Sequence, residues 1–438
     1  MSTFKKEGEM NKQNGSRFPG FYKLSVQQRI KALSDLICHL SDKEEWALMR
    51  ETLPYKIADR MSENVIGVFG LPLGVAVNFK INGKSYVIPM AIEETSVVAA
   101  ASNSARLISE HGSLTAVAED PIMEAQIQVI NVPDFSAAAI RILSEKKNLL
   151  RLANRQDPTL VSVGGGAKDL YVRKLQTVGG PMLIVHLSVD VRDAMGANTV
   201  NTMAEALGPE VAKITGGEVI CQIITNLCDK SLVRSRFEIQ VDCLARAEFS
   251  GREVAERIVS AYHFADADPY RAATHNKGVM NGIDGILIAT GNDWRAVEAA
   301  CHAYTARDGR YRSLSKYQIE GDKLIGEIEL PIAVGVVGGV TRFHPGVRIV
   351  HKLMGITYRR ELAEIVAAAG LVQNFSALRM LVTEGIQRGH MRLNAPNTAY
   401  FSRATIGNAA IEAANQFVRQ GLIVFDRAKE RVRKRWRS

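Results

Sequence analysis

The centre of the chain reads Met182-Leu-Ile-Val-His-Leu-Ser-Val-Asp-Val191, then Arg192-Asp-Ala-Met-Gly-Ala-Asn198, then a helical pattern as far as Ile214. The first run is rich in branched apolar residues, which is typical of a buried strand. The small residues that follow permit a tight turn into the helix. Two interpretations are open at this point: a purely structural turn, or a helix start whose free amides bind an anionic pyrophosphate.

The same alternation extends in both directions from this stretch. Branched apolar runs predict strands at 127–132, 160–163 and 219–225, and helical spacing predicts helices at 136–148 and 199–214. Strands and helices that interleave in this way indicate a compact α/β unit between Asp120 and Asn226. No Gly-x-Gly-x-x-Gly run follows any of these strands, so an ordinary Rossmann site is not predicted.

The flanking regions have a different character. Asn82-Gly83 separates two strand-like runs and supplies the positive φ angles of a two-residue turn, which predicts a hairpin over 74–89. Glu93 and Glu94 precede an alanine-rich helix, where acids in a first turn would be stabilised by the helix dipole. Helical spacing also predicts helices at 25–40, 251–265 and 365–389.

The bulk composition is that of a soluble globular enzyme with two or three domains. The 438 residues are 46% apolar and 23% charged, with a net charge of +9 that is concentrated in part at 427–437. A basic run of this kind is usually a solvated helix end or a frayed tail, and less often a contact for nucleic acid or acidic lipid. A third interpretation is that positive potential attracts polyanionic small molecules. Aromatic and basic residues do not interleave as in nucleic-acid-binding proteins, so that class is not expected.

Several other classes are excluded by simple counts. Five scattered cysteines without a Cys-x-x-Cys pair favour reduced thiols in a cytoplasmic protein. No His-Glu-x-x-His run or His/Cys cluster has metal-ligand spacing, so no metal is expected. The longest apolar stretches are shorter than the ~20 residues of a membrane helix. Residues 1–17 are polar and predict a disordered leader.

Four ionisable residues in separate parts of the chain form a candidate catalytic set: Glu94, Lys277, Asp293 and His390. A buried lysine beside a carboxylate can stabilise an oxyanion, a carboxyl group can deliver a proton, and an imidazole can protonate a departing thiolate. Each has a structural alternative when it is taken alone. Glu94 can be a helix acid, Lys277 and Asp293 can be a salt bridge, and His390 can be an ordinary surface or core histidine.

Longer runs around these residues resemble class II 3-hydroxy-3-methylglutaryl-coenzyme A reductase, the bacterial and archaeal kind. The resemblance extends from about Glu51 to about Arg392, roughly four-fifths of the chain. It rests on Glu63-Asn-Val-Ile-Gly-Val-Phe-Gly-Leu-Pro-Leu-Gly-Val-Ala76, Pro89-Met-Ala-Ile-Glu-Glu94, Val189-Asp-Val-Arg-Asp-Ala-Met-Gly-Ala-Asn-Thr-Val-Asn-Thr-Met-Ala-Glu205 and Gly291-Asn-Asp-Trp-Arg-Ala-Val-Glu298.

The resemblance implies an α+β fold with three parts. These are a large substrate domain over 18–119 and 226–384 with a central helix, an inserted ferredoxin-like cofactor domain over 120–225, and a mobile helical flap over 385–438. Family members place the active site at a dimer interface, so an obligate homodimer or a larger oligomer such as a hexamer is expected. The implied reaction is the reversible, two-step reduction of hydroxymethylglutaryl-coenzyme A to mevalonate and free coenzyme A, through a hemithioacetal and mevaldehyde, with two dinucleotides consumed.

The resemblance also implies a role for each site residue. Lys277 stabilises the oxyanion, His390 protonates the coenzyme A thiolate, Glu94 donates a proton in the second step, and Asp293 orients Lys277. The substrate contacts implied are Ser96, Asn226, Arg271, Asn281 and Gln373. The cofactor contacts implied are Asp157, Asp193, Ala194, Met195, Gly196, Ala197 and Asn198.

The choice of dinucleotide depends on Asp157. A carboxylate at that position accepts hydrogen bonds from a ribose 2′-hydroxyl and repels a 2′-phosphate, which favours NADH. Arg155 beside it can serve the phosphate instead, so NADPH stays possible. Two other enzyme-like alternatives also stay open: an acyl-coenzyme A oxidoreductase that acts on another acid, and a paralogue that binds coenzyme A or a dinucleotide without turnover.

Overall fold

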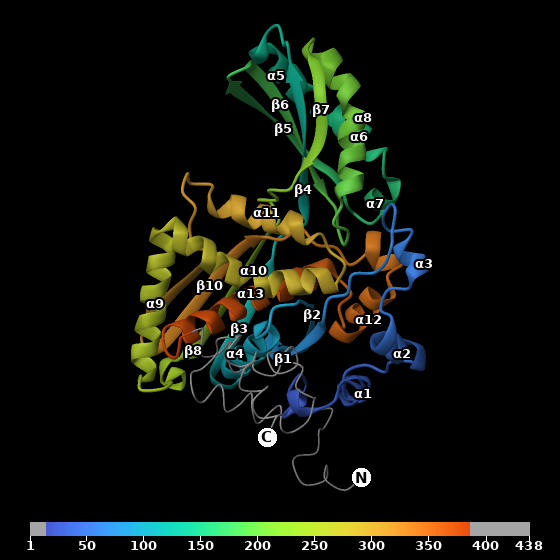
Figure 1. Cartoon of the computed structure of the whole chain (residues 1–438). Coiled ribbons are helices and arrows are strands. Elements are labelled where there is room, and N and C mark those ends of the chain that lie inside the picture. Colours follow the sequence, from blue (N-terminus) through green and yellow to red (C-terminus); the bar gives the residue numbers. More distant parts are fainter. Residues whose placement is uncertain (1–14, 386–438) are drawn as a thin grey trace, which may run out of the picture.

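The computed structural model describes residues 15–385, and these form a small unit standing on a large one (Figure 1). The predicted leader lies almost wholly outside the described residues, and so does all but the first residue of the predicted flap. The mixture of helices and strands confirms the α+β class. Each unit is built around its own hydrophobic core.

The small unit is an antiparallel sheet of order β5-β6-β4-β7 with helices on one face. Its chain order of one strand, helices, two strands, a helix and a last strand is that of the ferredoxin-like β-α-β-β-α-β motif. The elements are β4 (Ile122–Ile130), α5 (Phe135–Ser144), α6 (Lys146–Asn154), α7 (Pro158–Ser162), β5 (Gly166–Thr177), β6 (Gly180–Asp190), α8 (Ala197–Thr215) and β7 (Glu218–Thr225).

The large unit is formed by the chain before and after the small unit. Its first part contains α1 (Val26–Leu36), α2 (Asp42–Arg50), α3 (Tyr55–Ala58), β1 (Leu73–Ile81), β2 (Lys84–Ala91), α4 (Val97–His111) and β3 (Gly112–Ala118). Its second part contains β8 (Leu232–Gln240), α9 (Gly251–Ala267), α10 (Pro269–Ala289), α11 (Trp294–Thr305), β9 (Ser315–Glu320), β10 (Lys323–Pro331), α12 (Pro345–Met354) and α13 (Arg359–Leu381).

Helix α10 is the central element of the large unit. It packs between the β1–β2 hairpin and α13, and the other face of α13 covers the four-stranded sheet of order β3-β8-β10-β9. Small residues bring α10 and α13 close together: a methyl group at Gly282 would lie 2.8 Å from Gln373 Cβ, and one at Gly370 would lie 2.8 Å from Ile283 Cγ1. Because cores are closely packed, larger residues at these glycines would force the two helices apart.

Local sequence signals explain several boundaries. Ser25 with Gln28, and Ser41 with Glu44, form capping boxes that begin α1 and α2. The predicted hairpin is confirmed, with positive φ angles of 51° at Asn82 and 81° at Gly83.

Three sequence-based expectations were wrong in detail. The run 160–163 is not a strand but part of helix α7, because Asp157 caps the amide of Leu160 and proline occupies the first helical turn. The single helix expected at 136–148 is two helices, α5 and α6, that meet at Glu145. Glu94 is not in the first turn of α4, which begins after Ser96 and has no acid there.

Candidate active site

The Nζ atom of Lys277 donates a hydrogen bond to Glu94 Oε2, and this contact is the centre of the candidate site. Asn281 Nδ2 donates to the same carboxylate oxygen over 3.2 Å. Lys277 and Asn281 are four residues apart on α10, so they lie on one face of the helix. The structure therefore brings together three of the residues expected from the sequence, although Glu94 and Lys277 are separated by 183 positions.

The opposite side of α10 fixes the direction in which Lys277 points. The amide of Asn276 donates to the carbonyl of Arg312 over 2.8 Å and accepts from the backbone of Leu314 over 2.9 Å. His275 Nε2 lies 2.7 Å from Ser315 Oγ, and burial lowers the pKa of His275 to about 3. The side chains of His275 and Asn276 are buried and face the core. Lys277, the next residue on the helix, is therefore turned outward, on the same side as Asn281.

Glu94 lies in the short connection that follows the hairpin. Strand β2 ends at Ala91, and the short connection from it to α4 carries Glu94, which contacts Lys277 of α10. Ser96, the N-cap residue immediately before α4, has a φ angle of 74°. A left-handed serine is uncommon, and strained backbone of this kind concentrates at functional sites. Sequence reasoning gave no indication of this conformation.

Two further expected substrate contacts lie on the same pair of packed helices. Gln373 is a buried residue of α13, and its Oε1 atom has no hydrogen-bond partner among the described residues. Because an unsatisfied buried carbonyl is costly, this atom is a candidate acceptor for a ligand. Arg271 is half-buried in the first turn of α10, and burial lowers its pKa. A guanidinium nevertheless keeps its charge and can contact an anion.

Asp293 does not join Lys277 within one chain. Its carboxylate accepts a hydrogen bond from the amide of Ala296 over 3.1 Å, which caps α11, and it lies 3.7 Å from Arg295 Nε. A helix rise of about 1.5 Å per residue places Lys277 roughly 18 Å from the end of α10, where Asp293 follows.

His390 lies outside the described residues. Asn226 is exposed in the connection between β7 and β8.

The turn at 193–198 is held between the two units. Asp193 Oδ1 accepts from the backbone amide of Arg359 over 2.9 Å, and Val336 N donates to the Asp193 carbonyl over 2.9 Å. Gly196 has a φ angle of 89°, and a methyl group there would lie 2.3 Å from Val191 Cγ1. The left-handed glycine places Ala197 at the start of the 19-residue helix α8. The first amides of α8 are thus available to an anion, as the ligand-binding interpretation of this turn requires.

Asp157 lies beside the first turn of α8. Its Oδ1 atom accepts from the amide of Leu160 over 2.9 Å, and its Oδ2 atom accepts from the hydroxyl of Thr199 over 3.0 Å. Met195 and Asn198 belong to the same turn region, and Ala194 N donates to the Val191 carbonyl over 3.2 Å. The expected cofactor residues of the small unit are therefore neighbours in space.

Arg359 is a residue near this turn that sequence reasoning missed. Its side chain is buried, and it donates to Ser231 Oγ and, over 2.8 Å, to the carbonyl of Ile332. Burial lowers the pKa of this guanidinium to about 10. The sequence signal, two arginines ahead of an apolar helix, looks like a solvated helix start, so only the fold reveals its burial.

Two features are absent from residues 15–385. Nowhere in this range do three or more His, Cys, Asp or Glu side chains gather as metal ligands would. Within the same range, no helix has the length and apolar composition needed to cross a membrane.

Comparison with known proteins agrees with this arrangement. The sequence pattern of the family Hydroxymethylglutaryl-coenzyme A reductase matches residues 25–395. The chain is 50% identical to 3-hydroxy-3-methylglutaryl-coenzyme A reductase of Archaeoglobus fulgidus over 434 residues, which cover 99% of this chain and 98% of that one. It is 35% identical to a probable enzyme of the same name from Borreliella burgdorferi, with 76% of each chain covered.

Solved structures give the same result. The enzyme of this name from Streptococcus pneumoniae superposes with a TM-score of 0.80 and 42% identity, covering 84% of this chain and 100% of that one. A second structure, with the same scores and coverage, is described as the class II enzyme of that organism bound to NADPH in open conformations. The extent and identity of these matches leave no room for a different family, and the chain belongs to the hydroxymethylglutaryl-coenzyme A reductases.

Proposed function

We propose that the protein reduces hydroxymethylglutaryl-coenzyme A to mevalonate and free coenzyme A, with two reduced nicotinamide dinucleotides consumed per thioester. The observation that carries the proposal is the contact of Lys277 with Glu94 and Asn281 on a surface that stays accessible: the lysine side chain is 59% exposed and the glutamate side chain 34%. A cation held by one carboxylate in an open site can also serve a second oxygen.

The roles follow from the chemistry of each group. Bound reduced nicotinamide would supply the hydride. The Lys277 ammonium is placed to stabilise the oxyanion that forms on the thioester carbonyl, and Asn281 adds a neutral donor beside it. His390 would protonate the coenzyme A thiolate as the hemithioacetal collapses. Glu94, in contact with Lys277, would supply the proton that completes reduction of the aldehyde.

The substrate acid would be held by the groups around this centre. We assign Arg271 to an anionic group of the substrate, and Gln373, whose buried Oε1 atom has no partner among the described residues, to a donor group. Ser96 lies beside Glu94 and is assigned to the acyl portion. Asn226 is assigned to the region of the reacting carbonyl.

The domain roles follow from the position of these residues. We assign the interval 120–225 to the dinucleotide, the intervals 18–119 and 226–384 to the thioester, and 385–438, which carries His390, to a closing flap. The fit of a dinucleotide rests on the turn at Gly196, where the absence of a side chain leaves the backbone open, and on the amides at the start of α8. Asp193, Ala194, Met195, Ala197 and Asn198 form the rest of that turn.

The dinucleotide proposed is NADH. The carboxylate of Asp157 lies against the first turn of α8 through Thr199, and a negative charge there disfavours a 2′-phosphate. The structure of the pneumococcal relative contains NADPH, so this chain would differ from that protein in the dinucleotide it prefers. A higher kcat/KM with NADPH than with NADH would overturn it.

The assembly proposed is a homodimer or a larger homo-oligomer. The connection between α3 and β1 contains no helix or strand, yet it exposes Ile66 at 99% and Phe69 at 94%. Apolar side chains grouped on one exposed segment are typical of an interface. A second copy would also account for Asp293, which cannot reach Lys277 along its own chain. Phe69→Lys should therefore shift the protein toward monomers in sedimentation velocity and lower its activity; unchanged assembly would contradict the assigned surface.

The direct test of the reaction uses purified protein with hydroxymethylglutaryl-coenzyme A and either NADH or NADPH. Loss of reduced nicotinamide absorbance and release of the coenzyme A thiol are followed together. Two dinucleotides oxidised per thiol released are expected. The variant His390→Gln should lose thioester reduction and still reduce added mevaldehyde, because no thiolate leaves in that half-reaction. Equal loss of both activities would contradict the role of His390.

A further inference from the structure

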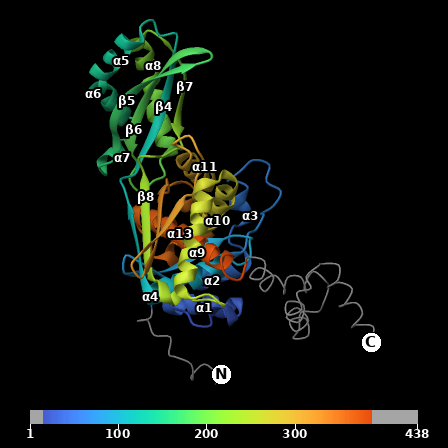
Figure 2. The same ribbon diagram turned by 90° about the vertical axis from the view of Figure 1, so that its left-hand side faces the viewer.

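The two units are joined by two short segments, residues 119–121 and 226–231, which we call the neck. Ladder pairing in the large unit ends with Ala118 opposite Val233, and in the small unit it begins with Glu124 opposite Thr225. Between them the backbones of the two segments are tied near the large unit by the amide of Glu119, which donates to the Leu232 carbonyl over 2.9 Å. So narrow a connection does not by itself fix the orientation of the small unit, which also depends on contacts made by side chains and by the 193–198 turn (Figure 2).

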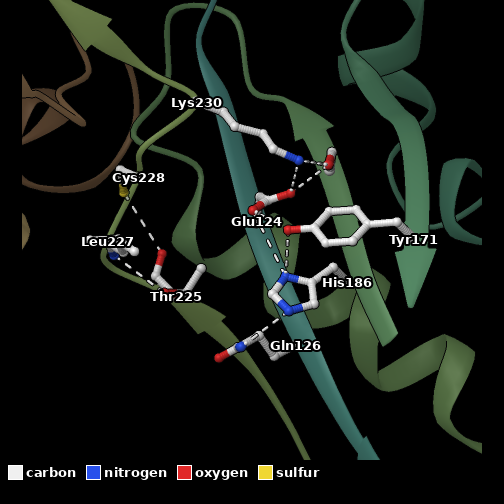
Figure 3. Close-up of polar contacts among 9 residues, drawn as sticks. Glu124, Gln126, Tyr171, His186, Thr225, Leu227, Cys228 and Lys230 are labelled. Carbon is white, nitrogen blue, oxygen red and sulfur yellow. Dashed lines mark hydrogen bonds and ion pairs between the residues drawn. The ribbon is translucent and has the colours of Figure 1, made fainter. Parts of the chain in front are cut away.

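A lysine of the neck is fixed to the sheet of the small unit. Lys230 Nζ donates to Glu124 Oε1 over 2.6 Å, and it lies 4.2 Å from the centroid of the Tyr171 ring. Ser188 Oγ donates to the same oxygen over 2.7 Å, and the Tyr171 hydroxyl donates to Oε2 over 3.1 Å. Figure 3 shows Lys230 reaching down from the neck to Glu124, on the face of the sheet without helices.

The glutamate in this cluster is a buried, fully bonded anion. Glu124 is 4% exposed. Burial by itself would raise its pKa, but hydrogen bonds from His186, Lys230 and Ser188 outweigh that effect and lower the pKa to about 2.

The neighbouring histidine completes the bonding of the cluster. The Tyr171 hydroxyl lies 2.9 Å from His186 Nδ1, and Gln126 Nε2 lies 3.3 Å from His186 Nε2. The imidazole also lies beside the anion, with its Nδ1 atom 3.8 Å from Glu124 Oε2. Both carboxylate oxygens of Glu124 accept hydrogen bonds from side chains within the cluster, so the cluster holds structure.

The next residue of the neck is fixed to the large unit instead. Ser231 Oγ accepts from the buried guanidinium of Arg359, and Ile332 N donates to the Ser231 carbonyl over 3.2 Å. The backbone of Arg359 in turn holds Asp193, the first residue of the turn at 193–198. Lys230 and Ser231 therefore anchor consecutive positions of one segment to opposite units, and that segment also carries Asn226.

We propose that Glu124 and Lys230 are positioning residues that hold the neck in one shape, and so set the place of the 193–198 turn relative to Lys277. Neither residue touches substrate. Their relevance to turnover rests on the proposed function, but their effect on the orientation of the small unit does not.

The first arm of the test measures that orientation directly. Spin labels are attached to the exposed native Cys221 of β7 and to a cysteine introduced at the exposed Gln318 of β9, with Cys38 and Cys243 replaced by serine. Labelled protein is diluted with unlabelled protein, so that only distances within one chain are measured. Lys230→Met should broaden or shift the distance distribution, and Lys230→Arg should restore it. An unchanged distribution in Lys230→Met would overturn the proposal, whatever reaction the protein catalyses.

The control is an ion pair of similar lysine exposure that does not reach the neck. Lys146 of α6 pairs with Asp169 of β5 inside the small unit, and its side chain is 37% exposed, against 40% for Lys230. Lys146→Met should leave the distance distribution as it is in the wild type. If Lys230→Met does not fold, Glu124→Gln removes the same ion pair at nearly constant volume and is measured in its place.

The second arm measures turnover. Lys230→Met should lower kcat by about tenfold, since small misplacements remote from the chemistry have effects of that order or more. Dinucleotide affinity and the KM for the thioester should stay near wild type, and Lys230→Arg should recover most of the rate. A loss of dinucleotide affinity that parallels the loss of rate would instead make Lys230 part of the cofactor site and overturn the positioning role.

Discussion

One glutamate–lysine pair lies in the large unit and another joins the neck to the small unit, and the two pairs differ in what surrounds them. In the large unit, Glu94 and Lys277 are 34% and 59% exposed, and the carboxylate accepts from two side chains of one helix. In the other pair, the side chain of Glu124 is only 5% exposed beside Lys230 of the neck, and it accepts from lysine, serine and tyrosine side chains. The first pair is open to a substrate, whereas the second is enclosed by side chains that bond to both oxygens of Glu124.

Physical chemistry assigns opposite consequences to these two environments. An exposed ion pair contributes roughly 0–1 kcal/mol to stability, so its loss is expected to appear in the reaction and hardly in folding. Removing one partner of a buried pair leaves an uncompensated charge or an unpaired donor, so its loss is expected to appear in stability and orientation. Substitutions in the two pairs should therefore separate rate from stability.

The largest effect is expected for Glu94→Gln. This change keeps the side-chain volume but removes both the partner of Lys277 and the proton donor, so kcat should fall by a factor on the order of 10² to 10⁴. The free energy of unfolding should change by less than about 1 kcal/mol because the pair is exposed.

The adjacent, exposed Glu93 is the matched control for that substitution. Glu93→Gln should leave both kcat and stability near wild type. Comparable losses in the two variants would mean that negative charge on the connection, and not the contact with Lys277, is what matters.

The next largest effect is expected on the stability of Glu124→Gln. The pKa of Glu124 is lowered in the folded protein from 4.5 to about 2. The ionised carboxylate therefore contributes fully to folding stability above its pKa in the unfolded chain, and this contribution is lost as pH falls from about 4.5 to about 2. The contribution corresponds to at most about 3 kcal/mol.

Urea unfolding of the wild type and of Glu124→Gln, at about pH 6 and at about pH 2, gives the difference in free energy of unfolding between the two proteins. The other titrating groups are common to both proteins, so their effects cancel in this difference. The wild type should be the more stable protein at the higher pH, and that advantage should shrink at the lower one. A difference that does not vary with pH would show that Glu124 is not a stabilising anion.

A smaller effect is expected at the small-unit residue Asp157, where the question is selectivity and not rate. Asp157→Ser keeps a capping oxygen for α7 and removes the negative charge beside Thr199. The ratio of kcat/KM for NADPH to that for NADH should rise about tenfold, since the charge repels a 2′-phosphate.

Asp134, which caps α5 in the same unit, provides the control. Asp134→Ser should leave the ratio unchanged. A ratio that stays constant in Asp157→Ser would place the 2′-position of the ribose elsewhere.

The difference between the two pairs also explains what could be predicted from the sequence. Glu94 was found because it lies in a run that resembles a known family, and Lys277 because it lies within the stretch of chain that the resemblance covers. The hairpin at Asn82-Gly83 was found because its turn chemistry is local. Glu124 and Lys230 gave no comparable signal, since a contact between residues 106 positions apart has no local pattern.

The errors of prediction have a similar origin. Branched residues at 160–163 favoured a strand, but the cap at Asp157 and the proline after it determine a helix. The role of Asp293 beside Lys277 is implied by the family resemblance and stays a prediction, because the helix between them keeps the two residues apart within one chain. Arg359 was overlooked because charge normally indicates exposure, and only tertiary packing buries it.

The central claim is that Lys277 stabilises the oxyanion of both hydride transfers. The most direct measurement compares Lys277→Ala with wild type at saturating dinucleotide, using hydroxymethylglutaryl-coenzyme A in one assay and mevaldehyde in the other. Both rates should fall by at least about 10²-fold while dinucleotide binding is retained. If either reaction proceeded at a rate near that of the wild type, the ammonium of Lys277 would not be the group that stabilises the transition state.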